Sequence, residues 1–136
     1  MPTQDEVRLV LPAMPEYLRL ARVTAAGLAS RLDFTVDQVE DLRLAIDELC
    51  FTLTGDQGRP GGTVELRYTL GEDFLAVEGT GRFDPGTRTA PAERSELSEL
   101  ILAALVDEHE ISGDGDGPRF SLVKRRATPG EHDRTE

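Results

Sequence analysis

The stretch from Thr35 to Thr54 constrains the fold most, because it joins a complete helix-start signal to a long apolar stripe. Thr35 suits the N-cap position and Gln38 completes a capping box with it, so a helix should begin at Val36 and stop near Gly55. Apolar residues then recur at spacings of three and four, at Val39, Leu42, Ile46, Leu49 and Leu53. Most charged residues lie elsewhere on the helix, so one face is predicted to be buried and the other solvated.

Alternating and periodic stretches on both sides of this helix predict the rest of one domain. Strands are expected at residues 6–11, 64–70, 74–78, 110–112 and 119–125. Further helices are expected from Pro15 onward and from about 96 to 107. The order β-α-α-β-β-α-β-β predicts an α+β fold, a two-layer α/β sandwich with three helices on one face of a mixed, mainly antiparallel sheet.

Glycine and proline mark the expected connections. Residues 55–62 should be the main flexible connection, and residues 79–93 a second long loop in which Gly79 and Gly81 are turn residues. Residues 1–126 are expected to form a single domain and residues 127–136 a disordered tail.

The formal charge of −11 opposes adhesion to nucleic-acid phosphates or anionic membranes. An acidic surface serves solubility in many proteins, and it would also suit a basic protein partner. Cys50 is the only cysteine, which excludes an intramolecular disulfide, and its apolar neighbours predict a small buried side chain. No apolar run approaches the roughly 18 residues that span a bilayer, and no secretory signal is evident, so a cytoplasmic protein is expected.

The segment DLRLAIDELC from Asp41 to Cys50, with the β-hairpin expected from the strands at 64–70 and 74–78 and the later LAALVDEHE, resembles the GHKL (histidine kinase-like) ATPase domain of bacterial anti-sigma factors. More narrowly, it is similar to the RsbW-type anti-sigma factors and switch-protein serine kinases, particularly their divergent actinobacterial members. The resemblance covers roughly residues 5–126. It implies ATP and magnesium as cofactors.

In that family a glutamate acts as a base near the γ-phosphate, and an asparagine four residues later helps to bind magnesium. Glu48 matches the glutamate, whereas Thr52 replaces the asparagine with a shorter, neutral hydroxyl. In the adenine-reading motif, Glu78 replaces the aspartate, and Thr80 and Arg82 replace two glycines. These departures predict weakened nucleotide binding.

The resemblance also aligns Glu96, Leu97 and Ser98 with a glycine-rich turn whose backbone N–H groups approach phosphates. Side chains there would block the approach, and the carboxylates of Glu96 and Glu99 would repel phosphate.

The sequence offers less support for other kinds of catalytic or metal-binding site. With His109 and His132 as the only histidines, neither a catalytic triad nor a histidine-based metal cluster is expected, and His109 should be structural. The run from Asp114 to Gly117 has the composition of a turn and lacks the ligand spacing of a calcium loop.

The resemblance thus implies an anti-sigma factor, homodimeric and acting in stress-response transcription, that sequesters an alternative sigma factor and is relieved by an anti-anti-sigma partner. Arg19 and Arg22 make the first helix locally basic, as either a solvated face or a partner-binding surface. The alternative is an active ATP-dependent serine kinase that phosphorylates its anti-anti-sigma antagonist, with Glu48 as the catalytic base. A GHKL-derived domain with an unrelated partner is a third hypothesis.

Overall fold

The computed structural model describes residues 4–55, 57–83, 96–114 and 117–127, and its elements follow the expected order. The strands are β1 (Asp5–Pro12), β2 (Thr63–Leu70), β3 (Phe74–Arg82), β4 (Glu108–Asp114) and β5 (Gly117–Arg125). The helices are α1 (Pro15–Arg31), α2 (Val36–Thr54) and α3 (Glu96–Leu105). The sheet order is β1-β2-β3-β5-β4, and each of these neighbouring pairs is antiparallel. The predicted α+β sandwich is confirmed, but the described strands form an antiparallel sheet and not a mixed one, because each strand pairs only with antiparallel neighbours.

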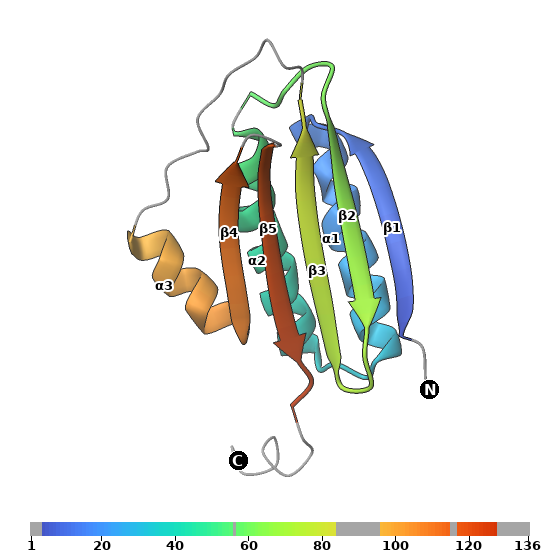
Figure 1. The fold of residues 1–136 in the computed structure, drawn as a ribbon. Helices are drawn as coiled ribbons and strands as arrows, with labels where there is room; N and C mark the ends of the chain where they lie inside the picture. Colours follow the sequence, from blue (N-terminus) through green and yellow to red (C-terminus); the bar gives the residue numbers. More distant parts are fainter. Residues whose placement is uncertain (1–3, 56, 84–95, 115–116, 128–136) are drawn as a thin grey trace.

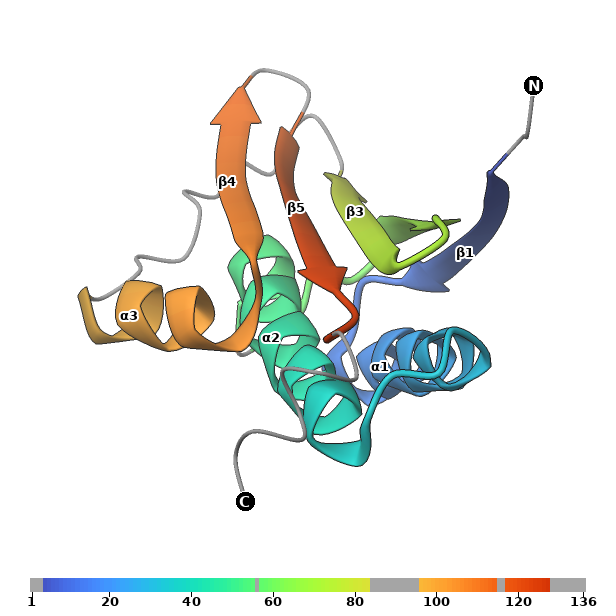
Figure 2. The ribbon, with the colours of Figure 1, turned by 90° about the horizontal axis from the view of Figure 1, so that it is seen from below.

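The helices gather on one side of the sheet (Figure 1). Seen from below, α1 and α2 lie side by side under the sheet, and α3 lies beyond α2 near β4 (Figure 2). The opposite face carries no helix from the described part of the chain. The molecule therefore has a covered face, where the core lies, and an open face.

The core forms between this sheet and the inner faces of α1 and α2. Leu42, Ile46 and Leu49 of α2 are fully buried, as the apolar stripe predicts. They belong to the same core as Leu66 of β2 and Val77 of β3. Burying each such side chain contributes about 1.5–3 kcal/mol, so α2 is anchored chiefly by this stripe.

The predicted start of α2 is confirmed in detail. The Thr35 hydroxyl accepts a hydrogen bond from the Gln38 N–H, and the Gln38 side-chain oxygen accepts one from the Thr35 N–H, each at 3.1 Å. The Gln38 amide also donates to the Arg125 carbonyl at 3.0 Å, which joins this helix end to β5. The helix ends at Thr54, where Gly55 has a φ of 71°.

Strand β3 is longer than expected, and the prediction that Gly79 and Gly81 are turn residues is wrong. Both lie in β3, which pairs with β2 as far as Arg82. A Cβ atom on Gly79 would lie 2.4 Å from the Phe120 ring, and one on Gly81 would lie 2.6 Å from the Phe83 ring. The glycines therefore make room for aromatic rings on the covered face.

Other boundaries shift for similar reasons. Helix α3 ends two residues early, because the Asp107 N–H donates to the Val123 carbonyl of β5 at 2.9 Å. Strand β4 is longer than expected because it pairs with β5 along its whole length.

In the 55–62 connection, the Arg59 N–H donates to the Ala13 carbonyl at 2.7 Å, which attaches the loop to the start of α1. Residues 84–93 of the expected second loop, and the expected tail beyond Ala127, lie outside the described residues.

Candidate functional site

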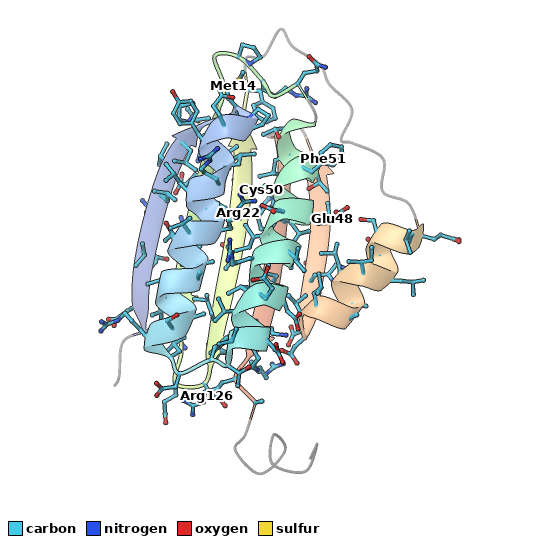
Figure 3. The ribbon with its side chains drawn as sticks, turned by 180° about the vertical axis from the view of Figure 1, so that it is seen from behind. Met14, Arg22, Glu48, Cys50, Phe51 and Arg126 are labelled. Carbon is cyan, nitrogen blue, oxygen red and sulfur yellow. The ribbon has the colours of Figure 1, made fainter. Side chains whose placement is uncertain are left out.

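The structure brings Glu48 and Ser98 together where α2 meets α3. The Ser98 hydroxyl donates a hydrogen bond of 2.5 Å to a Glu48 carboxylate oxygen. Glu48 lies on the side of α2 that faces α3 (Figure 3). Ser98 is buried and Glu48 is partly exposed. The proposed catalytic carboxylate is therefore engaged by a side chain 50 positions away in the sequence.

A second contact holds the C-terminal end of α3. The Lys124 ammonium donates to the Leu105 carbonyl, the last residue of α3, at 2.6 Å. The same ammonium lies 3.6 Å from the Asp41 carboxylate of α2. Lys124 shares the covered face with Phe120 and Leu122. Together with the contact between Ser98 and Glu48, this bridge holds α3 against α2 at both ends.

The Thr52 side chain, one turn after Glu48, points back toward the backbone of its own helix. Its side chain is 3% exposed, and its hydroxyl donates to the Leu49 carbonyl at 2.5 Å. Such bonding to a preceding carbonyl is a common way for a helical threonine to satisfy its hydroxyl. In this arrangement the Thr52 oxygen is not presented to a ligand.

Glu78 and Thr80 lie on the other side of the sheet. Along β3 the buried residues are Leu75, Val77, Gly79 and Gly81, so the alternating residues Glu78, Thr80 and Arg82 project onto the open face. They line a groove of about 390 Å³ there, together with Glu65, Arg67 and Arg119. The structure thus does not bring Glu78 or Thr80 to Glu48, Thr52 and Ser98.

The covered side of β3 near Gly79 is occupied by an aromatic ring. Phe120 of β5 pairs with Gly79 across the ladder, and its side chain is 2% exposed. The sequence contained the signal for this arrangement, because the alternation of Leu75 and Val77 continues to Gly79 when the strand is extended. Because the strand was expected to end at residue 78, Gly79 was not assigned to its buried face.

The two predicted partner-contact residues lie on α1 in different environments. Arg22 donates to the Asp47 carboxylate of α2 at 2.6 Å, which links the two helices. Arg19 is exposed. The same helix exposes Tyr17, Leu20 and Val23, which sequence reasoning did not single out. Their spacing of three residues places them along one stripe of the helix.

Two further side chains with reactive groups, Cys50 and Tyr68, are buried. Cys50 is buried, as expected, and burial, with a smaller contribution from the Asp47 charge, raises the pKa of its thiol to about 12. Burial likewise raises the pKa of Tyr68, whose hydroxyl donates to the Ala21 carbonyl at 2.8 Å. Both groups are neutral at physiological pH, so neither is suited to nucleophilic chemistry.

The described residues contain no cluster of metal-ligating side chains, and His109 instead lies 3.2 Å from the Glu99 carboxylate. No helix in this part of the chain is long and apolar enough to cross a membrane.

Comparison with known proteins places these features in a family. Residues 11–124 match the model of the histidine kinase-like ATPase domain. The serine-protein kinase RsbW of Bacillus velezensis is 36% identical over 139 residues, covering 88% of this chain and 85% of that protein. RsbW of Bacillus pumilus is 34% identical, covering 90% and 86%, and RsbW of Halalkalibacterium halodurans is 32% identical, covering 81% and 77%. The chain therefore belongs to the histidine kinase-like ATPase domain family and is a homologue of the RsbW serine-protein kinases.

Proposed function

We propose that this protein is an anti-sigma factor that sequesters an alternative sigma factor in the cytoplasm, is released by an anti-anti-sigma partner, and has a degenerate nucleotide site. The observation that carries the proposal is the separation of the expected nucleotide residues within a chain that keeps the family fold. Glu48 and Ser98 lie on the covered side of the sheet, and Glu78 and Thr80 project from the open side.

Mg-ATP fits these residues poorly. A carboxylate that reads adenine must share a cavity with the base that serves the γ-phosphate, and Glu78 lies across the sheet from Glu48. The Thr52 hydroxyl, the candidate metal ligand, is buried and hydrogen-bonded within its helix. The Phe120 ring fills the space over Gly79. We therefore assign this protein a binding role that does not require phosphoryl transfer.

The first helix supplies a suitable binding surface. We define the α1 surface as the exposed residues Tyr17, Arg19, Leu20 and Val23. Apolar side chains flanked by a guanidinium are the composition found at the centres of protein interfaces. Arg22 supports this surface from beside it, because its bond to Asp47 holds α1 against α2.

In this mechanism the protein acts by occlusion. The α1 surface covers parts of the sigma factor that engage polymerase, and a homodimer presents two such surfaces. The anti-anti-sigma partner competes for the complex and frees the sigma factor. None of these steps needs a bound cofactor.

Binding to alternative sigma factors of the native host tests the proposal. A fluorescently labelled sigma factor, titrated with the wild-type chain, should bind at micromolar concentrations or tighter. Arg19→Glu should weaken binding at least about tenfold, because it inverts a charge inside the surface. Arg31→Glu, also on α1 but at its last residue, is the matched control and should change affinity little. No binding to any sigma factor of the host would overturn the proposal.

The second candidate is an active serine kinase that phosphorylates the anti-anti-sigma partner. Two observations favour it: the relatives carry the name serine-protein kinase, and Glu48 is present. Calorimetric titration with ATP and magnesium separates the two functions. A degenerate site predicts millimolar or weaker affinity, whereas micromolar binding that Glu48→Ala abolishes would support the kinase instead.

A further inference from the structure

Helix α3 is apolar on almost every side, yet much of it is exposed. Seven of the ten residues in ELSELILAAL are leucine, isoleucine or alanine. Only Ser98 and Leu102 are buried, whereas Leu97 and Leu100 are 65% and 68% exposed and Ile101 is 42% exposed. A helix that is apolar all round is normally buried. Something is therefore expected to cover the outer side of α3.

Exposed apolar residues of α2 border the same region. Leu44, Glu48 and Phe51 follow one another at spacings of four and three, so they share one face of α2. Phe51, like Glu48, lies toward α3 (Figure 3), and the bond from Ser98 to Glu48 joins the two helices there. We define the α2–α3 surface as the exposed apolar residues of this region, Leu44, Phe51, Leu97, Leu100 and Ile101.

The rest of this chain has little with which to cover the α2–α3 surface. The segments outside the described residues are 1–3, 56, 84–95, 115–116 and 128–136. Apart from Met1, their sequences contain no leucine, isoleucine, valine, methionine or aromatic residue. Burial of large apolar side chains is what would repay the entropy of ordering a segment on this surface. We therefore look for the covering element in another molecule.

Charge indicates the chemistry of that molecule. Helix α3 carries Glu96 and Glu99 and no basic residue. Of the five carboxylates of α2, Asp47 pairs with Arg22, Asp41 lies 3.6 Å from Lys124 and Glu40 lies 3.5 Å from Arg43, whereas Glu48 borders the surface itself. The two helices that form the apolar surface still carry more negative than positive charge, which repels anionic lipid and attracts a cationic partner.

We propose that the α2–α3 surface binds a lysine- or arginine-rich amphipathic helix of a protein partner. Leucine-type side chains of that helix pack on Leu97, Leu100 and Ile101, and its basic side chains meet the carboxylates of α2 and α3. This mode is the packing of an amphipathic helix on an apolar surface. The site is separate from the α1 surface and opposite to it in charge, so the protein has two docking surfaces for chemically different segments.

The experiment uses the full chain and a labelled synthetic peptide of leucine and lysine, about 20 residues long so that it can form a helix. Its leucines occupy one helical face, and a scrambled peptide of the same composition is the control. Fluorescence anisotropy should show binding of the amphipathic peptide that weakens at higher ionic strength. The double variant Leu97→Ser with Leu100→Ser should weaken binding at least about tenfold.

A matched variant locates the site. Val10→Ser on β1 removes a side chain of similar exposure, 61%, and should leave the affinity unchanged. Circular dichroism should confirm that all variants are folded. The proposal is overturned if the scrambled peptide binds equally well, if the α3 double variant binds like the wild type, or if no peptide binds. It is also overturned if the double variant disrupts a dimer of this chain in analytical ultracentrifugation, because the surface would then be a self-contact.

Discussion

Replacing Gly79 with alanine measures how tightly the Phe120 ring fills the covered side of β3. The new Cβ atom would lie 2.4 Å from one ring carbon and 2.7 Å from the next, well inside van der Waals contact. The ring is 2% exposed, so it cannot swing into solvent. Overpacking of this kind costs about 1–3 kcal/mol. Contacts this short place the cost in the upper half of that range, about 2–3 kcal/mol. Removing a glycine from a strand stabilises by about 0.5–1 kcal/mol, so the net loss should be about 1–2.5 kcal/mol.

Urea unfolding followed by circular dichroism measures this loss as a lower midpoint at unchanged slope. For a domain of this size, the loss lowers the thermal midpoint by about 3–8 °C. Gly27→Ala is the matched control, because it makes the same change in α1 with nothing within 4 Å of the new Cβ atom. There the helix should gain about 0.5–1 kcal/mol, so the two identical substitutions should have opposite signs.

A double-mutant cycle isolates the contact. Phe120→Leu alone should destabilise the protein by leaving a cavity, but in the Gly79→Ala background part of that space is filled. The double variant should therefore be more stable than the two single losses predict, by about 0.5–2 kcal/mol. An unchanged or increased stability of Gly79→Ala would refute the tight packing of Phe120 on β3, and with it the argument that this space is closed to adenine.

Three further outcomes follow from the contacts described above. Ser98→Ala removes a hydrogen bond to a partly exposed carboxylate and should lower the free energy of unfolding by about 1 kcal/mol. In the Glu48→Ala background this hydrogen bond is already absent, so Ser98→Ala should there cost much less. The pKa of the Cys50 thiol is raised from 9.0 to about 12, so the unfolded chain releases its proton first and stability should fall as pH rises from 9 to 12. Cys50→Ala should flatten that decline in pH-dependent urea unfolding. Arg22→Ala breaks a surface ion pair whose side chains are 35% and 45% exposed, so it should cost no more than about 1 kcal/mol in thermal denaturation.

Most of the architecture was predictable because its signals are local. The capping box of Thr35 and Gln38 and the stripe along α2 define that helix through residues only a few positions apart. Alternation similarly located β2, the first part of β3 and β5. Strand ends were less predictable, because β3 and β4 extend as far as their neighbours can pair with them.

The candidate site was less predictable, because it depends on which face each residue occupies. Aligning Glu78 with the family's aspartate assumes that the two side chains point to the same face of the sheet. A shift of one residue along a strand moves a side chain to the opposite face. The structure places Glu78 on the open face and Gly79 under Phe120. Likewise, the spacing within α2 indicated that Glu48 and Thr52 share a turn, but not that Thr52 bonds its own backbone.

The sequence by itself determined the order and type of the elements, the capped and amphipathic α2, the buried Cys50 and the negative charge. Those properties follow from backbone periodicity, side-chain polarity and composition, which act over a few residues or over the whole chain. Only the tertiary structure decided that Ser98 engages Glu48, that Phe120 covers Gly79 and that the outer side of α3 is exposed. Each of these depends on the packing of elements distant in the sequence, and no local pattern specifies which side chains such packing brings together.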